Sequence, residues 1–390
     1  VAADAYPQVA LVGGWSQARN PALLNSPDFE DFVDQIPGGF EPRSQETWDA
    51  AIEVTQPVYS GGKVRASIEL AEVVAAIADA QIDDSQLDTA LATAEAFYQL
   101  LAAERSLDVV AAQQRARQAS LDVVEARYEL GDATELERLR GRSALAEVAP
   151  ELARAEGEVE VARSRLASLL ALDPTTSIGV VSSVDKLPEM VSHTELDKTV
   201  ERPDLIDLAL QIDALEQESV VTRAEQRPQV DFELLYGRQA RLIEDIEDPL
   251  FDNWRVALTV RWEFFDGGRR RAELAQLDSR REQATWRLRA REDAVALEIA
   301  EARTDYRAAR ATAEAADLAA EVAREASRVA AESFQLGVAL QADLLDAQEQ
   351  EIQADLSAVR AYYDALIAST RLSRALGKLP TEPWWEENHP

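Results

Sequence analysis

The chain repeats itself over most of its length at a constant offset of 206 residues. At this offset Trp48 falls on Trp254, Gly61-Gly62 on Gly267-Gly268, and Leu130-Gly131 on Leu336-Gly337, and no gap is needed between these matches. Such self-similarity indicates two copies of one structural unit. We therefore divide the chain into repeat 1, residues 1–201, and repeat 2, residues 202–390.

Each repeat contains two segments in which apolar and polar residues alternate, as they do in β-strands with one exposed and one covered face. We predict strands at 6–16 and 46–58 in repeat 1, and at 228–238 and 253–265 in repeat 2. The alternation is clearest in the last of them, where Trp254, Val256, Leu258, Val260 and Trp262 share one face.

After each double glycine the strand pattern gives way to helical sequence without proline for more than sixty residues. We predict long helices at 63–130 and 269–336, each about 100 Å long at 1.5 Å per residue. Returning helices follow at 134–172 and 339–376, and a further helix covers 203–226. Repeat 1 has no counterpart of this last helix, so we expect a leading helix to be missing. Gly61, Gly62, Gly267 and Gly268 are predicted strand-to-helix corners, because glycine permits the backbone angles that a corner needs.

The helices do not have a continuous apolar seam. Leu107-Asp108-Val109-Val110 recurs two heptads later as Leu121-Asp122-Val123-Val124, but the seam positions between them are predicted to be Gln114 and Arg117. Such a heptad pattern with polar breaks is typical of helices that are solvent-exposed on two faces, as in the wall of a water-filled tube. An ordinary soluble coiled coil is the alternative.

Composition excludes several functions. The chain has 72 acidic and 40 basic residues, a formal charge of −32, whereas a nucleic-acid binder needs a basic surface. It has no cysteine, and its two histidines lie far apart, so we expect no metal site. No phosphate-binding loop or nucleophile–base pair is recognisable, and we predict neither cofactor nor enzymatic activity.

Four strands cannot close into a barrel, which takes about eight. The chain must therefore associate with copies of itself so that the apolar strand faces turn outward to lipid. Aromatic residues support this prediction, because they fall at two levels about a bilayer apart, as membrane-interface residues do. The loop-end level contains Trp15, Trp48, Tyr236 and Trp254, and the glycine-end level contains Tyr59, Trp262, Phe264 and Phe265. A soluble β-sandwich is the alternative.

These features resemble the TolC-like outer-membrane factor family, also called outer membrane efflux proteins. The similarity covers nearly the whole chain and includes Pro7-Gln8-Val9, Gln56-Pro57-Val58-Tyr59-Ser60-Gly61-Gly62, Arg202-Pro203-Asp204-Leu205 and the two glycine turns. It implies a mixed α and β fold: a homotrimer with a 12-stranded transmembrane β-barrel, four strands per chain, continued by a long α-helical periplasmic barrel. Residues 175–200 would form a small equatorial segment. The implied function is a passive outer-membrane exit channel of a tripartite efflux or type I secretion system.

The resemblance also assigns roles to the turns between the long helices. Leu130, Gly131, Asp132, Leu336, Gly337 and Val338 are implied to meet a periplasmic adaptor (membrane fusion) protein, which links the channel to an inner-membrane pump. Asp343, Asp346 and Glu137 are implied to narrow the entrance. Asp343 and Asp346 share a helix face, and threefold symmetry would gather six carboxylates that attract cations. Solvated surface acids are the alternative.

Two positions depart from some family members. Ala339 stands where those members have an arginine, and Phe334 stands where they have an aromatic hydroxyl. Their closed-state lock is therefore not expected here. The rival function is a trimeric coiled-coil or adhesin-type periplasmic spacer without a pore, which would not need paired alternating strands.

Overall fold

The computed structural model of the chain describes residues 2–18, 45–173, 202–248 and 252–378, together with positions 176, 178–180, 187 and 250. Most of the predicted equatorial segment and the C-terminal tail lie outside these residues. The chain forms two compact units, and each of them takes segments from both predicted repeats. Unit 1 comprises residues 1–78 and 208–287, and unit 2 comprises residues 79–207 and 288–390.

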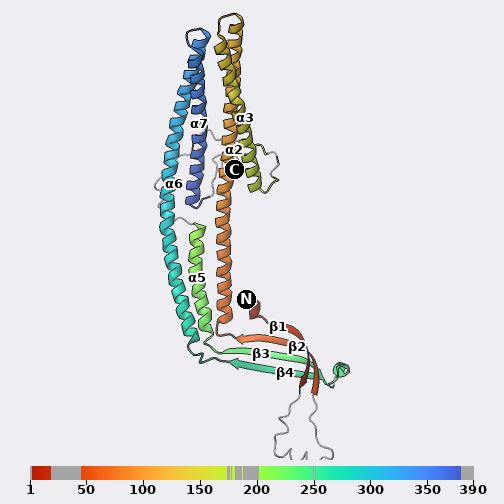
Figure 1. Ribbon diagram of the computed structural model, residues 1–390. Helices are drawn as coiled ribbons and strands as arrows, with labels where there is room; N and C mark the ends of the chain where they lie inside the picture. Colours follow the sequence, from red (N-terminus) through yellow and green to blue (C-terminus); the bar gives the residue numbers. More distant parts are fainter. Residues whose placement is uncertain are drawn as a thin grey trace, which may run out of the picture. The chain divides into compact units, whose positions relative to one another are not determined.

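Unit 1 contains a four-stranded antiparallel sheet, β1 (Gln8–Ala18), β2 (Gln45–Tyr59), β3 (Gln229–Ala240) and β4 (Asp252–Arg261), in that order (Figure 1). Its register aligns the apolar residues of all strands in rows across one face. One row is Val9, Val54, Leu234 and Val256, and the next is Leu11, Ile52, Tyr236 and Trp254. Most of these side chains are exposed, Leu11 by 86%.

The helical part of unit 1 consists of the first turns of α2 (Lys63–Glu129) and α6 (Arg269–Gln335) and most of α5 (Pro203–Ala224). Short 3₁₀ helices, η1 (Ala2–Ala5) and η3 (Ile243–Glu247), accompany the sheet. The predicted end of the fourth strand at residue 265 is wrong, because β4 ends at Arg261. Residues 262–268 instead form a hydrogen-bonded corner ahead of α6.

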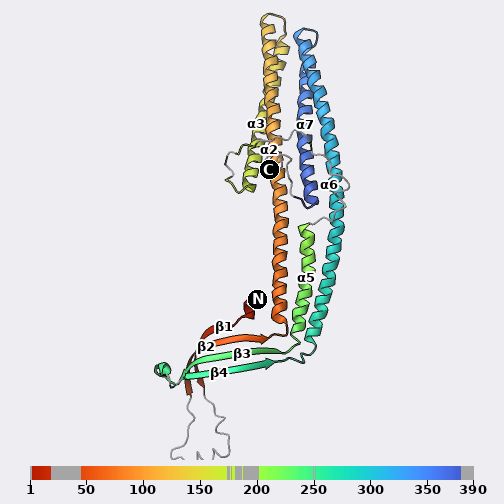
Figure 2. The same ribbon diagram turned by 180° about the vertical axis from the view of Figure 1, so that it is seen from behind.

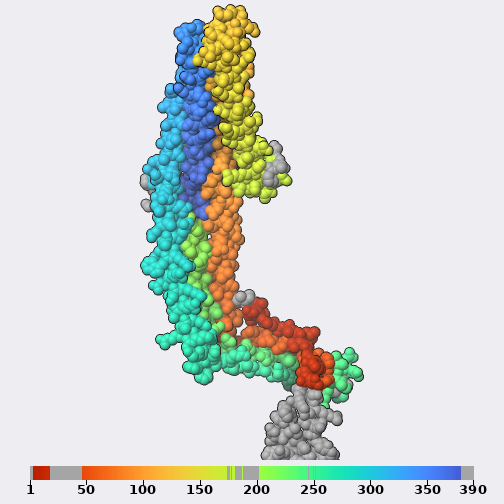
Figure 3. All heavy atoms as spheres, viewed as in Figure 1, coloured from red at the N-terminus to blue at the C-terminus, as the bar shows by residue number. Residues whose placement is uncertain are grey.

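Unit 2 consists of two helical hairpins. The first joins α2 to α3 (Glu135–Leu169), and the second joins α6 to α7 (Gln341–Ala375). Helices α2 and α6 both have 67 residues, and α3 and α7 both have 35. Both ribbon views show the helices of this unit in the order α3, α2, α7, α6 (Figures 1 and 2). The surface of α7 is visible between α6 and the first hairpin (Figure 3).

Apolar clusters pack α7 against its neighbours at two levels of unit 2. Tyr98 and Leu101 of α2 contact Tyr363 and Leu366 of α7 in one cluster. Nearer the turns, Val124, Phe334 and Leu344 form a second cluster. Because close-packed apolar side chains resist changes of helix spacing, these clusters fix α7 beside α2 at both levels.

A charged cluster holds the start of α5 in unit 2. The fully buried Arg202 donates two 3.0 Å hydrogen bonds to Asp204, and further bonds to Glu298 at 3.2 Å and to the carbonyl of Ala375 at 2.9 Å. Although burial opposes ionisation of Asp204, hydrogen bonds from Arg202 and Arg291 hold its pKa below the usual value. Because Asp204 and Glu298 neutralise its charge, the buried Arg202 can link the Ala375 carbonyl at the end of α7 to Glu298 of α6.

None of the described helices contains a stretch both long enough and apolar enough to cross a membrane.

Candidate functional site

The two predicted corners have nearly the same backbone. Gly61 and Gly62 have φ of +65° and +92°, and Gly267 and Gly268 have φ of +68° and +91°. Residues with side chains rarely adopt such angles, so glycine is needed at each position. In the first corner the chain is also crowded, because a Cβ on Gly61 would lie 2.7 Å from the Cβ of Arg227 and 2.9 Å from the carbonyl oxygen of Ala224.

The second corner is built around a buried arginine. Arg270 is 4% exposed and donates to the Asp266 carboxylate at 2.5 Å, to the carbonyl of Glu263 at 2.6 Å and to the carbonyl of Glu225 at 2.8 Å. Asp266 also accepts from the backbone N–H groups of Gly268 and Arg270. The Arg270 side chain and these backbone donors lower the pKa of Asp266 to about 2.

The end of α5 connects both corners. Arg227 donates to the carbonyl of Gly61 at 2.9 Å, and the Glu225 carboxylate pairs with Lys63 at 2.9 Å. The carbonyl of Glu225 accepts from Arg270 in the second corner. Glu225, Arg227 and Arg270 were not predicted from the sequence. The two charged residues Glu225 and Arg227, directly before a predicted strand, were a usable signal for the end of α5.

The predicted interface aromatics all lie in unit 1, on the sheet or beside it. At the loop end they form cross-strand pairs: Trp15 faces Trp48 with ring centroids 6.2 Å apart, and Tyr236 faces Trp254. At the glycine end Tyr59 ends β2, while Trp262, Phe264 and Phe265 lie in the second corner. Phe264 is 83% exposed, and the Trp262 indole N–H donates to the carbonyl of Gln226 at 3.1 Å.

The turns of both hairpins in unit 2 are Schellman-type caps that end in glycine. Gly131 has a φ of +83°, and the N–H of Asp132 donates to the carbonyl of Arg127 at 2.8 Å. Gly337 has a φ of +74°, and Val338 donates to Ser333 at 2.9 Å. Exposed apolar side chains surround both turns: Leu130, Leu136, Leu139, Leu336, Val338 and Leu340. Leu136, Leu139 and Leu340 were not predicted.

The three predicted constriction acids lie at the starts of α3 and α7; Asp343 and Asp346 are exposed, and Glu137 is half-buried. Glu137 accepts from the backbone N–H of Thr134 at 2.6 Å, and Asp343 accepts from the N–H of Leu340 at 3.2 Å. Both acids thus cap their own helices at equivalent positions of the two hairpins. The backbone and hydroxyl of Thr134 lower the pKa of Glu137. Asp346 lies one turn beyond Asp343.

Two contacts between the hairpins were not predicted. Arg127 of α2 donates to the carbonyl of Phe334 at 3.3 Å, and its guanidinium lies 5.3 Å from the centroid of the Phe334 ring. Gln341 of α7 donates to the carbonyl of Glu137 at 2.9 Å. The start of α3 therefore contacts the start of α7, two residues before Asp343. Neither Arg127 nor Gln341 belongs to a recognisable motif, so the sequence gave no signal for them.

Within the described ranges, no three or more histidine, cysteine or acidic side chains are grouped so that they could hold a metal ion.

Comparison with known proteins shows which family the chain belongs to. Residues 1–172 and 198–378 match the sequence profile of the family described as outer membrane efflux protein. The chain is also 30% identical over 361 residues to protein CyaE of Bordetella pertussis, a match that covers 90% of this chain and 71% of CyaE.

Solved structures share the fold. The outer membrane protein VceC of Vibrio cholerae aligns with a TM-score of 0.72 at 20% identity, over 96% of this chain and 88% of VceC. The CmeC outer membrane channel of Campylobacter jejuni gives 0.73 at 14% identity, over 99% of this chain and 81% of CmeC. The open state of the MtrE outer membrane channel of Neisseria gonorrhoeae gives 0.74 at 18% identity, over 96% and 81%.

Proposed function

The chain belongs to the outer membrane efflux protein family, and we propose that it is the passive exit duct of a tripartite efflux or type I secretion system. Members of this family are outer-membrane channels that extend into the periplasm, not enzymes. In the proposed system an inner-membrane pump supplies the energy, and a periplasmic adaptor protein connects that pump to the duct.

The observation that carries the proposal is the exposed apolar face of the sheet. Its rows of valine, leucine, isoleucine and aromatic side chains run unbroken across four strands, and such a face is stable in contact with lipid tails. Among the described residues, β1 and β4 are paired on one side only, so each leaves an edge of unpaired backbone groups that lipid cannot satisfy. Three copies joined edge to edge would form a closed 12-stranded barrel and remove every such edge.

Cysteine cross-linking tests this arrangement, because the chain has no cysteine of its own. Gly13 of β1 would be changed to cysteine and combined in turn with a cysteine at each position from Arg255 to Thr259 of β4. We expect oxidation of the detergent-extracted protein to give dimers and trimers for the double variants at matching register and monomers for each single variant. Monomers throughout, with no conductance in planar bilayers, would favour a spacer without a pore.

The exposed hairpin turns support adaptor docking. Leu130 and Leu336 are each 79% exposed and Val338 is 82% exposed, although apolar side chains gain by leaving water. We assign Leu130, Gly131, Asp132, Leu336, Gly337 and Val338 to this contact. A tryptophan at Gly131 and at Gly337 should abolish export while trimers still assemble. Unchanged export by that double variant would move the contact elsewhere.

We assign Asp343 and Asp346, together with Glu137, to the entrance of the duct. The exposure of Asp343 and Asp346 supports this assignment, because carboxylates that face water keep their charge and attract cations into a pore. Their capping bonds hold Glu137 and Asp343 in place at the first turns of α3 and α7. The two roles are compatible, since a carboxylate can accept a backbone hydrogen bond and still present its charge to solvent.

A further inference from the structure

A polar hollow interrupts the packing of α2 against α7 within unit 2. It has a volume of about 310 Å³ and extends from Arg105 to Arg117, about 18 Å along the helix at 1.5 Å per residue. The apolar cluster around Leu101 and Leu366 closes one end, and the cluster around Val124 and Leu344 lies beyond the other. These packed ends hold α2 and α7 at a fixed spacing, so the helices cannot close the hollow by moving together.

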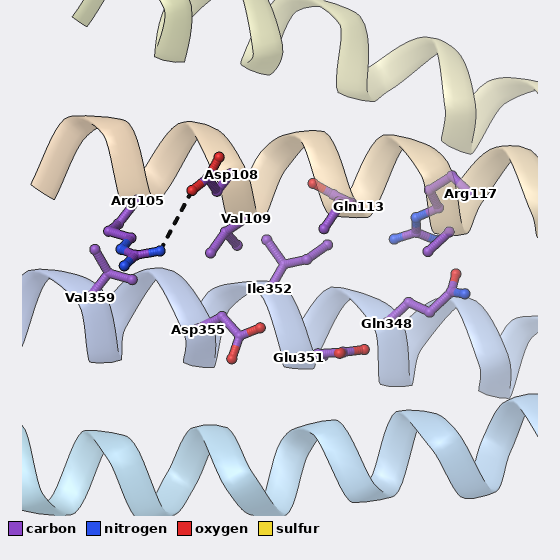
Figure 4. A pocket seen from close by; sticks show the side chains of 12 residues that line it. Arg105, Asp108, Val109, Gln113, Arg117, Gln348, Glu351, Ile352, Asp355 and Val359 are labelled. Carbon is purple, nitrogen blue, oxygen red and sulfur yellow. Dashed lines mark ion pairs between the residues drawn. The ribbon is translucent and has the colours of Figure 1, made fainter. Parts of the chain in front are cut away.

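Three buried polar side chains reach into one end of this hollow (Figure 4). Gln113 and Arg117 are 7% exposed and Gln348 is 8% exposed. Within the part of the chain that the structure describes, Gln113 Oε1, Arg117 Nε and Gln348 Oε1 have no hydrogen-bond partner. A buried polar atom left unpaired costs about 1–3 kcal/mol. Three such atoms among the residues that line one hollow indicate that something else supplies the missing bonds.

The walls of the hollow limit what that occupant can be. Val109 and Ile352 form an apolar middle section (Figure 4). A buried water molecule needs two to four polar partners, and this section offers few. An organic molecule can cover the apolar wall with carbon atoms and still bond to the polar end. At roughly 30 Å³ per water molecule, the volume equals about ten waters, which is enough for a small ligand.

The charges and hydrogen-bonding groups of the lining further limit the chemical class of the bound molecule. Arg117 pairs with Glu349 at 3.4 Å, Asp355 with Arg324 at 2.8 Å, and Arg105 lies 3.9 Å from Asp108. Glu351 also lines the hollow, so these groups comprise three arginines and four acids, and a net charge on the ligand would gain little. A carboxamide can present its oxygen or its NH₂ group, and a hydroxyl pairs with either, because it both donates and accepts. The same hydroxyl can accept from the Nε–H of Arg117.

We infer that the α2–α7 hollow is a binding site for a small, neutral, hydroxyl-rich organic molecule, held by Gln113, Arg117 and Gln348 against the apolar wall of Val109 and Ile352. The site was not recognised from the sequence. The predicted polar seam break at Gln114 is wrong, because Gln113 is the buried residue, while Arg117 does line the hollow as a seam position.

The test uses the whole chain purified in detergent, with myo-inositol and glucose as probes and glycine betaine, which has no hydroxyl, as the negative probe. Saturation-transfer NMR and titration would measure binding. We expect saturable binding of at least one hydroxylated probe and none of betaine. Gln113→Leu combined with Gln348→Leu should weaken binding at least tenfold. Gln118→Leu, at an exposed position of α2 that lies outside the hollow, should leave it unchanged.

A second variant shows whether a loss of binding in the double leucine variant comes from the hollow or from misfolding. Ala112→Leu narrows the hollow without removing a polar group, and it should also weaken binding at least tenfold while the protein remains folded. The proposal is overturned if neither hydroxylated probe binds the wild-type chain, which would mean that the hollow holds water only. It is equally overturned if the double leucine variant and the Gln118→Leu control bind alike.

Discussion

Replacing Arg127 tests whether the contact between the two hairpins holds the proposed entrance closed. The Arg127 guanidinium lies 5.3 Å from the Phe334 ring centroid and donates a 3.3 Å bond to the Phe334 carbonyl. The ring contact is worth about 0.5–1 kcal/mol at a half-exposed site. The bond is long, so we add only about 0.5 kcal/mol to this figure. Arg127→Ala should therefore remove about 1–1.5 kcal/mol per protomer.

If this contact exists only in the closed entrance, its loss raises the open-to-closed ratio about tenfold per protomer, since 1.4 kcal/mol is a factor of ten. The open probability of single channels in planar bilayers measures this directly. Arg127→Lys keeps the charge but loses the planar stacking surface, so it should give an intermediate value. Arg140→Ala removes an exposed arginine of α3 and controls for charge near the turns.

Equal open probabilities for Arg127→Ala and Arg140→Ala would show that the contact does not hold the entrance closed. The same conclusion would follow if Arg127→Ala lowered the unfolding midpoint while channel opening remained that of the wild type. The contact would then stabilise the fold without holding the entrance.

Four further predictions concern the entrance, the corners and the sheet. Asp343→Asn with Asp346→Asn should lower cation-over-anion selectivity in bilayer recordings, most strongly at low salt, whereas Asp317→Asn on α6 should not. The pKa of Asp266 is lowered from 3.8 to about 2, so its ionised form stabilises the fold fully above about pH 4, and this stability is lost as the pH falls toward 2. The unfolding midpoint of Asp266→Asn should therefore depend less on pH in this range. Gly237→Ala would place a Cβ 2.2 Å from the carbonyl oxygen of Ala50 and should prevent trimer recovery, while Gly13→Ala, with 3.7 Å of space, should assemble normally. Gly61→Ala should lower the unfolding midpoint more than Gly267→Ala. Alanine is strained at the positive φ of both positions, but only at Gly61 would its Cβ also meet neighbouring atoms. Equal shifts of the two midpoints would contradict this.

The secondary structure was largely predictable because its signals are local. Alternating apolar residues predicted four strands within a few residues of β1 to β4, and the double glycines marked the starts of α2 and α6. The overextended fourth strand has a physical explanation. Trp262, Phe264 and Phe265 favour a strand by composition, but Arg270 binds the carbonyl of Glu263 and turns the chain toward α6.

The site was predictable only where a residue acts through its exposure or its backbone. The positive φ of Gly131 and Gly337 follows from local sequence, whereas Asp343 was singled out through the family resemblance, and its place at an entrance stays a prediction. Arg127, Gln341 and Glu225 could not be singled out, because each acts through a backbone carbonyl bond to a residue far away in the sequence. No sequence pattern specifies such a partner, since every residue has a carbonyl group.

Two side chains that connect the hairpins near their turns, Arg127 and Gln341, stand at positions where the repeats differ. At the hairpin turns the caps are equivalent, with Glu137 and Asp343 binding the N–H of Thr134 and Leu340. The linking side chains have no such equivalence: Arg127 corresponds to Ser333, and Gln341 corresponds to Glu135. Each of the two bonds runs from a side chain of one hairpin to a backbone carbonyl of the other, and neither Ser333 nor Glu135 has the long nitrogen donor that Arg127 and Gln341 supply. Divergence at these positions therefore allows one hairpin to hold the other, while the shared glycines and caps preserve the shape of both.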